Sequence, residues 1–206
     1  MNKYTENSRK ILDTTKETIL SFFEIYKEIK VEENAKQQDL LRAIILFSCS
    51  GIDAVIKQLI NDTLEEIIKK DEGAQSYFKN YIEKKIKNNN DVYNSKLLSE
   101  IFISDEKPKD TLIRILKREL MANSLQSAEE LSRVAAYFNI ETTDIDKIKE
   151  VFVVRNQITH EMDIDMSSEV IIRRNRNKED IKEYSDRIIK LAEHYIKSIE
   201  NKLELD

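Results

Sequence analysis

Arg155 and His160 are the residues whose types and spacing best suit chemistry in this sequence. Histidine transfers protons near neutral pH, and arginine grips a phosphate through two parallel hydrogen bonds. RNA cleavage needs a group that activates the ribose 2′-hydroxyl, a group that protonates the leaving 5′-oxygen and a cation that stabilises the phosphorane. Arginine and histidine supply all three without a metal. The pair therefore predicts RNA phosphodiester cleavage, with the amide of Asn156 orienting His160 or binding a phosphate oxygen.

The spacing of the two residues restricts how they can act together. In an α-helix, side chains five positions apart point about 140° away from each other. A single chain places Arg155 and His160 well only if the helix relaxes in its last turn. Two chains that pack these helices together would each supply an arginine and a histidine to one cleft. Because this also explains how one histidine per chain fills two proton-transfer roles, we expect a homodimer with a composite site.

A basic run and one acidic residue are further candidates for the same site. Arg173, Arg174 and Arg176 follow the motif and could track an RNA backbone, although a solvated loop has the same composition. Asp53 lies in an apolar segment, where a buried carboxylate needs a partner. Pairing of Asp53 with the arginine or histidine of the motif is one hypothesis. The alternative is exposure on the polar side of its helix.

The remaining candidates for chemistry are the single cysteine and the second histidine. Cys49 lies in an apolar run and is interpreted as a buried structural thiol. His194 lies within the last expected helix and is interpreted as a surface or packing residue. The sequence has no pair of histidines four positions apart, no second cysteine and no glycine-rich phosphate loop. It therefore predicts neither a metal nor another cofactor.

Composition limits the fold and the partners. Charged residues make up 35 % of the 206 positions, with only 2 glycines and 1 proline, which favours long helices over strands and turns. A net charge of -5 argues against wholesale polyanion binding, so contact with RNA must be local. One cysteine excludes an internal disulfide framework and fits a reducing compartment. No apolar run approaches the ~20 residues that span a bilayer, so we expect a cytoplasmic protein without a membrane partner.

Apolar residues recur at three- and four-residue spacing along most of the chain, which is the period of amphipathic helices. Gly51 lets a neighbouring helix come close, Pro108 fits the first turn of a helix, and Ser127 with Glu130 resembles a capping box. The sequence predicts an all-α bundle of long antiparallel helices in a single domain, 1–206, with a smaller helical insertion at 73–110. Helices are expected over about residues 6–30, 38–70, 111–120, 131–138, 143–160 and 178–203.

Arg155-Asn156, three intervening residues and His160, near the end of the penultimate expected helix, resemble the motif of the HEPN superfamily (higher eukaryotes and prokaryotes nucleotide-binding). The helix order extends the resemblance over residues 35–200. It implies a helical bundle that dimerises about the motif helices and acts as a metal-independent endoribonuclease. Arg155 and His160 would be catalytic, and Asn156 would be the polar residue that follows the arginine. Such proteins commonly act in toxin–antitoxin or antiviral defence systems, which implies a possible antitoxin or other partner protein.

Two alternatives to an active ribonuclease remain open. Glu161 and Asp163 place acidic charge beside the motif, where it would repel phosphate. The chain would then be an inactive helical module of the same fold that binds RNA, a nucleotide or a protein partner. In the second alternative, Arg155 and His160 only complement the negative end of the helix dipole.

Overall fold

A computed structural model describes residues 3–87, 94–142, 145–167 and 170–204 of the chain. It confirms the predicted all-α architecture, and the expected helices are present within a few residues of their predicted limits. The start predicted at residue 143 lies outside the described residues. The helices are α1 (Glu6–Glu28), the 3-10 turn η1 (Val31–Glu33), α2 (Asn34–Lys70), α3 (Glu72–Ile86), α4 (Ser95–Ile103), α5 (Pro108–Ala122), α6 (Ala128–Phe138), α7 (Ile145–His160) and α8 (Lys178–Glu204).

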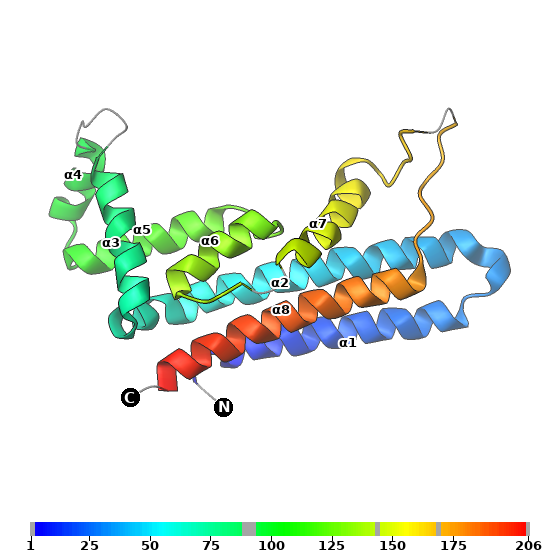
Figure 1. The fold of residues 1–206 in the computed structure, drawn as a ribbon, viewed down its shortest axis with the longest axis horizontal. Coiled ribbons are helices and arrows are strands. Elements are labelled where there is room, and N and C mark those ends of the chain that lie inside the picture. The colour runs from blue at the N-terminus through cyan, green and yellow to red at the C-terminus, as the bar shows by residue number, and fades with distance from the viewer. Residues whose placement is uncertain (1–2, 88–93, 143–144, 168–169, 205–206) are drawn as a thin grey trace.

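Three long helices, α1, α2 and α8, lie side by side and form the body of the molecule (Figure 1). α1 runs antiparallel to the other two, as predicted, whereas α8 runs in the same direction as α2. The parallel pair is possible because the chain returns to the start of α8 through a long connection after α7. α3, α4 and α5 lie at the end of the molecule where α2 ends. α7 packs against the part of α2 that these three helices do not cover.

α2 is the core helix of the bundle, and its buried side chains extend from Leu41 to Ile68. By length and composition α2 passes as a membrane span, with a mean hydropathy of 1.7 over 18 residues. However, 56 % of that window is buried inside the protein. The apolar character of α2 therefore accords with its central place among α1, α7 and α8.

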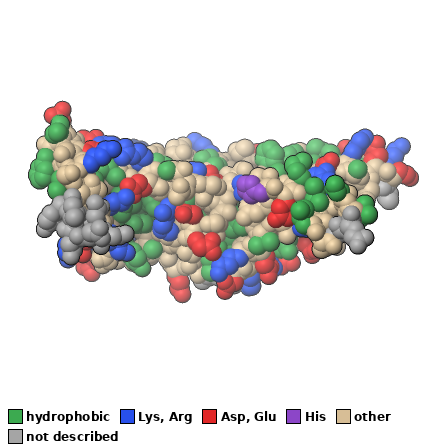
Figure 2. Space-filling model, turned by 90° about the horizontal axis from the view of Figure 1, so that it is seen from above, with side chains coloured by type: hydrophobic (Ala, Val, Ile, Leu, Met, Phe, Trp, Pro, Cys, Tyr) green, Lys and Arg blue, Asp and Glu red, His purple; other side chains and the backbone are tan. Residues whose placement is uncertain are grey.

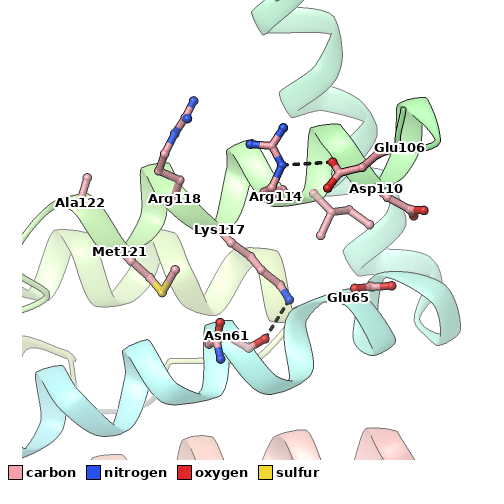
Figure 3. A pocket seen from close by; sticks show the side chains of 10 residues that line it. Asn61, Glu65, Glu106, Asp110, Arg114, Lys117, Arg118, Met121 and Ala122 are labelled. Carbon is pink, nitrogen blue, oxygen red and sulfur yellow. Dashed lines mark hydrogen bonds and ion pairs between the residues drawn. The ribbon is translucent and has the colours of Figure 1, made fainter. Parts of the chain in front are cut away.

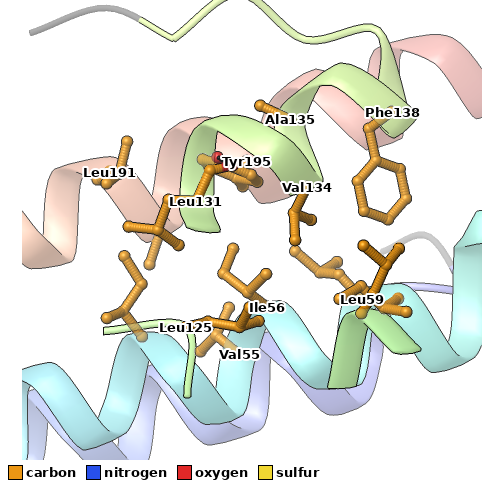
Figure 4. Close-up of a cluster of buried hydrophobic side chains, with 14 of the residues drawn as sticks. Val55, Ile56, Leu59, Leu125, Leu131, Val134, Ala135, Phe138, Leu191 and Tyr195 are labelled. Atoms are coloured by element: carbon orange, nitrogen blue, oxygen red, sulfur yellow. Dashed lines mark hydrogen bonds between the residues drawn. The ribbon is translucent and has the colours of Figure 1, made fainter. Parts of the chain in front are cut away.

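A cluster of apolar side chains packs α6 against α2 and α8 (Figure 4). The phenol of Tyr195 in α8 is fully buried, and its hydroxyl donates a hydrogen bond of 2.7 Å to the carbonyl oxygen of Leu131. A buried hydroxyl with a partner avoids the cost of an unsatisfied polar group. The cluster thereby supports the layer against which α7 packs.

Gly51 and Pro108 have the predicted structural roles, and Ser127 forms its half of the predicted capping box, whereas the Glu130 carboxylate pairs with Arg133. A methyl group at Gly51 would overlap the side chain of Thr15, whose Cβ lies only 3.0 Å from the position of the added carbon, so this glycine does allow α1 to approach α2 closely. Pro108 is the first residue of α5. The Ser127 hydroxyl accepts a hydrogen bond of 3.1 Å from the backbone N–H of Glu130 at the start of α6. The segment predicted as an insertion, 73–110, contains most of α3, all of α4 and the start of α5.

Candidate functional site

The Arg155 to His160 motif occupies the last turns of α7. Ile148, Val151, Phe152, Val154 and Ile158 are buried and hold α7 against the bundle. This packing leaves Arg155 half-buried and leaves Asn156 and His160 exposed. Figure 2 looks onto the side of the molecule that carries α7, where a histidine with a basic side chain beside it lies at the surface. The motif is therefore open to a large substrate.

The three motif side chains meet within one chain. Nη1 of Arg155 donates a hydrogen bond of 2.9 Å to Oδ1 of Asn156 and lies 3.5 Å from Nε2 of His160. Of the two arrangements that the helical spacing left open, the structure shows the contact within a single chain, at the last turn of α7, while a site shared between two chains stays a prediction. The guanidinium, the amide and the imidazole of the motif therefore lie together at the end of α7.

Arg155 keeps its charge available. Among the residues that the structure describes, its guanidinium contacts the asparagine and the histidine of the motif and no carboxylate. Cys49 of α2 lies near enough to experience the charge of Arg155. Burial nevertheless raises the pKa of the Cys49 thiol to about 12, which confirms that this cysteine is a buried, unreactive thiol.

The acidic residues after the motif are neutralised by arginines. Oε2 of Glu161 accepts a hydrogen bond of 3.1 Å from Arg174. Asp163 is fully buried, and its carboxylate accepts hydrogen bonds from Arg42 of α2 and from Arg176. The repulsion expected from an acidic flank is therefore largely cancelled, because both carboxylates already have cationic partners.

The basic run that follows the motif holds the connection between α7 and α8 together. Nη1 of Arg173 donates to Oδ1 of Asp39 at 2.7 Å, and Arg174 is the partner of Glu161. The Arg176 side chain is only 12 % exposed and is directed at Asp163, which contradicts its predicted role as a free phosphate contact. Arg173 and Arg174 keep exposed surface, so their contact with RNA stays a prediction.

Asp53 does not pair with the motif, and this hypothesis was wrong. Its Oδ1 accepts a hydrogen bond of 2.6 Å from the backbone N–H of Leu125, and its Oδ2 lies 2.9 Å from Nζ of Lys57. The carboxylate thus satisfies the connection between α5 and α6 rather than the site. His194 likewise serves packing, because its Nε2 lies 2.9 Å from the carbonyl oxygen of Glu141.

Sequence reasoning missed the residues of α2 that hold the motif end in place. Arg42 is buried and binds Asp163, while the Gln38 side chain exchanges two hydrogen bonds with the backbone of Arg176, at 3.0 and 2.6 Å. A signal for Arg42 was present, since a charged residue inside the apolar run Leu40 to Leu46 needs a buried partner. No local signal identified Asp163 as that partner.

A groove of about 560 Å³ lies between α2 and α5, toward the end of the bundle that carries α3 and α4 (Figure 3). Part of its charged lining is paired within the groove: Lys117 donates to the carbonyl oxygen of Asn61 at 2.8 Å, and Arg114 donates to Glu106 at 3.1 Å. The described lining contains no histidine. The groove therefore lacks the imidazole that the end of α7 presents.

Comparison with known proteins agrees with the motif. A sequence model of the family described as RiboL-PSP-HEPN matches residues 11–201. Comparisons with curated proteins and with solved structures gave no significant match. The family match begins within α1 and ends within α8, and it includes the end of α7.

Proposed function

Because the chain belongs to the RiboL-PSP-HEPN family, and thus to the HEPN superfamily that its motif indicated, we propose that it is a metal-independent endoribonuclease. One observation carries the proposal: the exposed end of α7 brings a guanidinium without a carboxylate partner, among the described residues, to 3.5 Å from an imidazole nitrogen. These are a phosphate-binding cation and a proton carrier in one place.

In the proposed reaction the ribose 2′-oxygen attacks the adjacent phosphorus, and the bond from phosphorus to the 5′-oxygen breaks. His160 takes the 2′-hydroxyl proton as general base, and a second His160 gives a proton to the leaving 5′-oxygen. Arg155 stabilises the negative charge of the phosphorane, and Asn156 orients the guanidinium through its side-chain oxygen. The products are a 2′,3′-cyclic phosphate and a 5′-hydroxyl.

Two proton transfers and one histidine per motif favour a homodimer that joins two α7 helices in one cleft. Exposed apolar side chains around the motif support such a contact: Val153 of α7 is 55 % exposed and Ile171 of the connection is 85 % exposed, with Met162, Met166, Val170 and Ile172 also exposed. Exposed apolar side chains in such numbers are uncommon on a monomer and often belong to a protein interface. We further propose that a partner protein restrains the enzyme, as in a toxin–antitoxin or antiphage system.

The test is RNA cleavage in excess EDTA with mapped product ends. We expect 2′,3′-cyclic phosphates from a single-stranded RNA oligonucleotide and no cleavage of the same sequence with 2′-deoxyribose. His160→Ala should abolish cleavage, while sedimentation experiments should show that its dimer does not dissociate. His194→Ala should cleave normally. Cleavage that persists in His160→Ala would overturn the assignment. RNA binding without cleavage by the unaltered protein would instead support the inactive module.

A further inference from the structure

Asp163 is a buried charge for which the proposed reaction has no use. Its side chain has no exposed surface. Oδ2 accepts hydrogen bonds from Nε of Arg42 at 2.6 Å and from Nε of Arg176 at 3.2 Å, and Oδ1 accepts from Nη2 of Arg176. Burying a carboxylate costs so much free energy that it persists only where partners of this quality are fixed around it.

The same cluster contacts the motif from two directions. Nη2 of Arg176 also donates a hydrogen bond of 2.9 Å to Oε1 of Gln157, which lies between Arg155 and His160 in the sequence. The backbone N–H of Asp163 donates to the carbonyl oxygen of Gln157 at 2.8 Å. The last turn of α7 is thus tied to the cluster through both a side chain and the main chain.

The backbone that joins His160 to Asp163 is unusual. Met162 and Asp163 have φ angles of 53° and 61°, in the left-handed region that residues other than glycine rarely adopt. The chain is held in this conformation by Arg42 from α2 and by the pairing of the connection, in which the N–H of Arg174 donates to the carbonyl oxygen of Asp163 at 2.7 Å. Backbone in such regions persists where surrounding contacts fix it, and it is concentrated at functional sites.

We propose that Asp163 is a positioning residue, whose carboxylate, held by Arg42 and Arg176, fixes the end of α7 and thereby places the His160 imidazole beside Arg155. Asp163 itself touches no substrate. Its kinetic consequence rests on the proposed ribonuclease function, whereas its effect on the position of His160 does not.

The first test observes the imidazole directly. The chain has only two histidines, so histidine ring signals in NMR spectra of the ¹⁵N-labelled protein resolve into His160 and His194. We expect Asp163→Asn to shift and broaden the ring signals of His160 at a fixed pH and to leave those of His194 in place. Unchanged His160 signals in a folded Asp163→Asn protein would overturn the proposal.

The second test separates positioning from stability. Asp163→Asn should lower kcat by about tenfold to a hundredfold, because small displacements of a reacting group are costly, while KM changes only a few-fold. Glu200→Gln is the matched control: it removes a partly buried carboxylate that an arginine holds, Arg9 at 2.8 Å, between α1 and α8 away from the motif. This control should lower the melting temperature without changing kcat at a temperature where all variants are folded.

A third variant keeps the proposal testable if Asp163→Asn does not fold. Gln157→Met removes only the acceptor of Arg176 and leaves the buried ion pairs intact. We expect the same changes in the His160 signals and in kcat, with smaller size, and their absence would overturn the proposal. If the unaltered protein cleaves no RNA but these variants still move the His160 signals, the ribonuclease function fails and the positioning role stands.

Discussion

Arg155 contacts both of its motif partners through one guanidinium nitrogen, Nη1. Among the described residues, no carboxylate contacts the remaining N–H groups of the guanidinium, and these groups can face a phosphate. A planar fork of this kind binds two phosphate oxygens at once, whereas a lysine ammonium acts as a single point charge. The role of this residue therefore depends on its shape as well as on its charge.

This dependence on shape can be measured with Arg155→Lys, which keeps the positive charge. We expect kcat/KM for RNA cleavage to fall by about 10²- to 10³-fold, as for the loss of a donor to a charged transition state. Arg114→Lys, in the groove between α2 and α5, is the control and should cleave at the normal rate. A lysine variant with nearly full activity would mean that charge alone suffices at this position.

Some site residues could be identified from the sequence, and others could not. Arg155, Asn156 and His160 could be found because their types suggest a reaction and their spacing is short. The assignment of Asp53 failed, and the pairing of Asp163 with Arg42 was missed, for the same reason. Which two charges meet across 121 positions depends on how helices pack, and the sequence carries no local trace of that distance.

At the scale of elements, α7 and the connection to α8 form one unit around the buried Asp163. Burial by itself raises the pKa of the Asp163 carboxyl, but hydrogen bonds and charges from Arg176 and Arg42 outweigh it, so the pKa lies below its ordinary value of 3.8. A carboxyl whose pKa is lower in the folded than in the unfolded protein stabilises the fold at pH values above the ordinary pKa. That contribution is lost as the pH falls through the lower, folded-state value.

Asp163→Asn should therefore lower the free energy of unfolding by about 3–5 kcal/mol at pH 7, because it breaks a buried ion pair. The difference in unfolding free energy between the unaltered protein and the variant should shrink as the pH falls below about 3.8. Urea unfolding, followed by circular dichroism between pH 7 and pH 2.5, measures this difference in unfolding free energy. Other paired carboxylates such as Glu200 titrate in both proteins and cancel. A difference that stays constant over this range would contradict the assigned ion pairs.

The contact between α1 and α2 provides a second test at this scale. Gly51→Ala adds a methyl group that overlaps Thr15, so we expect a loss of about 1–3 kcal/mol in the free energy of unfolding. Thr15→Ala should recover part of this loss in the double variant, since it removes the overlapping atoms. Ser50→Ala, at a neighbouring exposed position, should change stability by less than about 0.5 kcal/mol. Equal effects of Gly51→Ala and Ser50→Ala would mean that the helices do not meet here.

The helices could be predicted because the spacing of apolar residues encodes each of them locally. Pro108 and Ser127 marked helix starts for the same local reason. The connection from 161 to 177 could not be predicted, since its shape depends on Arg42 and Gln38 of α2 rather than on its own composition. The parallel course of α2 and α8 follows from that connection and was missed with it.

At the scale of the whole molecule, the long helices form a scaffold that carries the motif at its surface, and the proposed reaction needs a second copy. Mixing equal amounts of the unaltered protein and His160→Ala tests this directly, because a mixed dimer holds only one of the two histidines that the proposed reaction uses. After subunit exchange about half of the dimers contain one chain of each kind, and about a quarter contain two unaltered chains. We expect the rate of RNA cleavage per unaltered chain to fall to about half, since only dimers of two unaltered chains keep both histidines. A rate that stays proportional to the amount of unaltered chain, while mixed dimers are detected by mass spectrometry, would exclude a shared cleft.

α2 also determines which changes of length this protein can accept. Gln38, Arg42, Cys49 and Asp53 lie along one stripe of this helix. Gln38 and Arg42 contact the connection, Cys49 lies near the motif arginine, and Asp53 contacts the turn before α6. One inserted or deleted residue between Arg42 and Asp53 would rotate everything beyond it by about 100° and turn half of the stripe away from its partners. Related sequences should therefore vary in composition along this stretch while its residue count stays fixed, and indels should collect in the connections between helices instead.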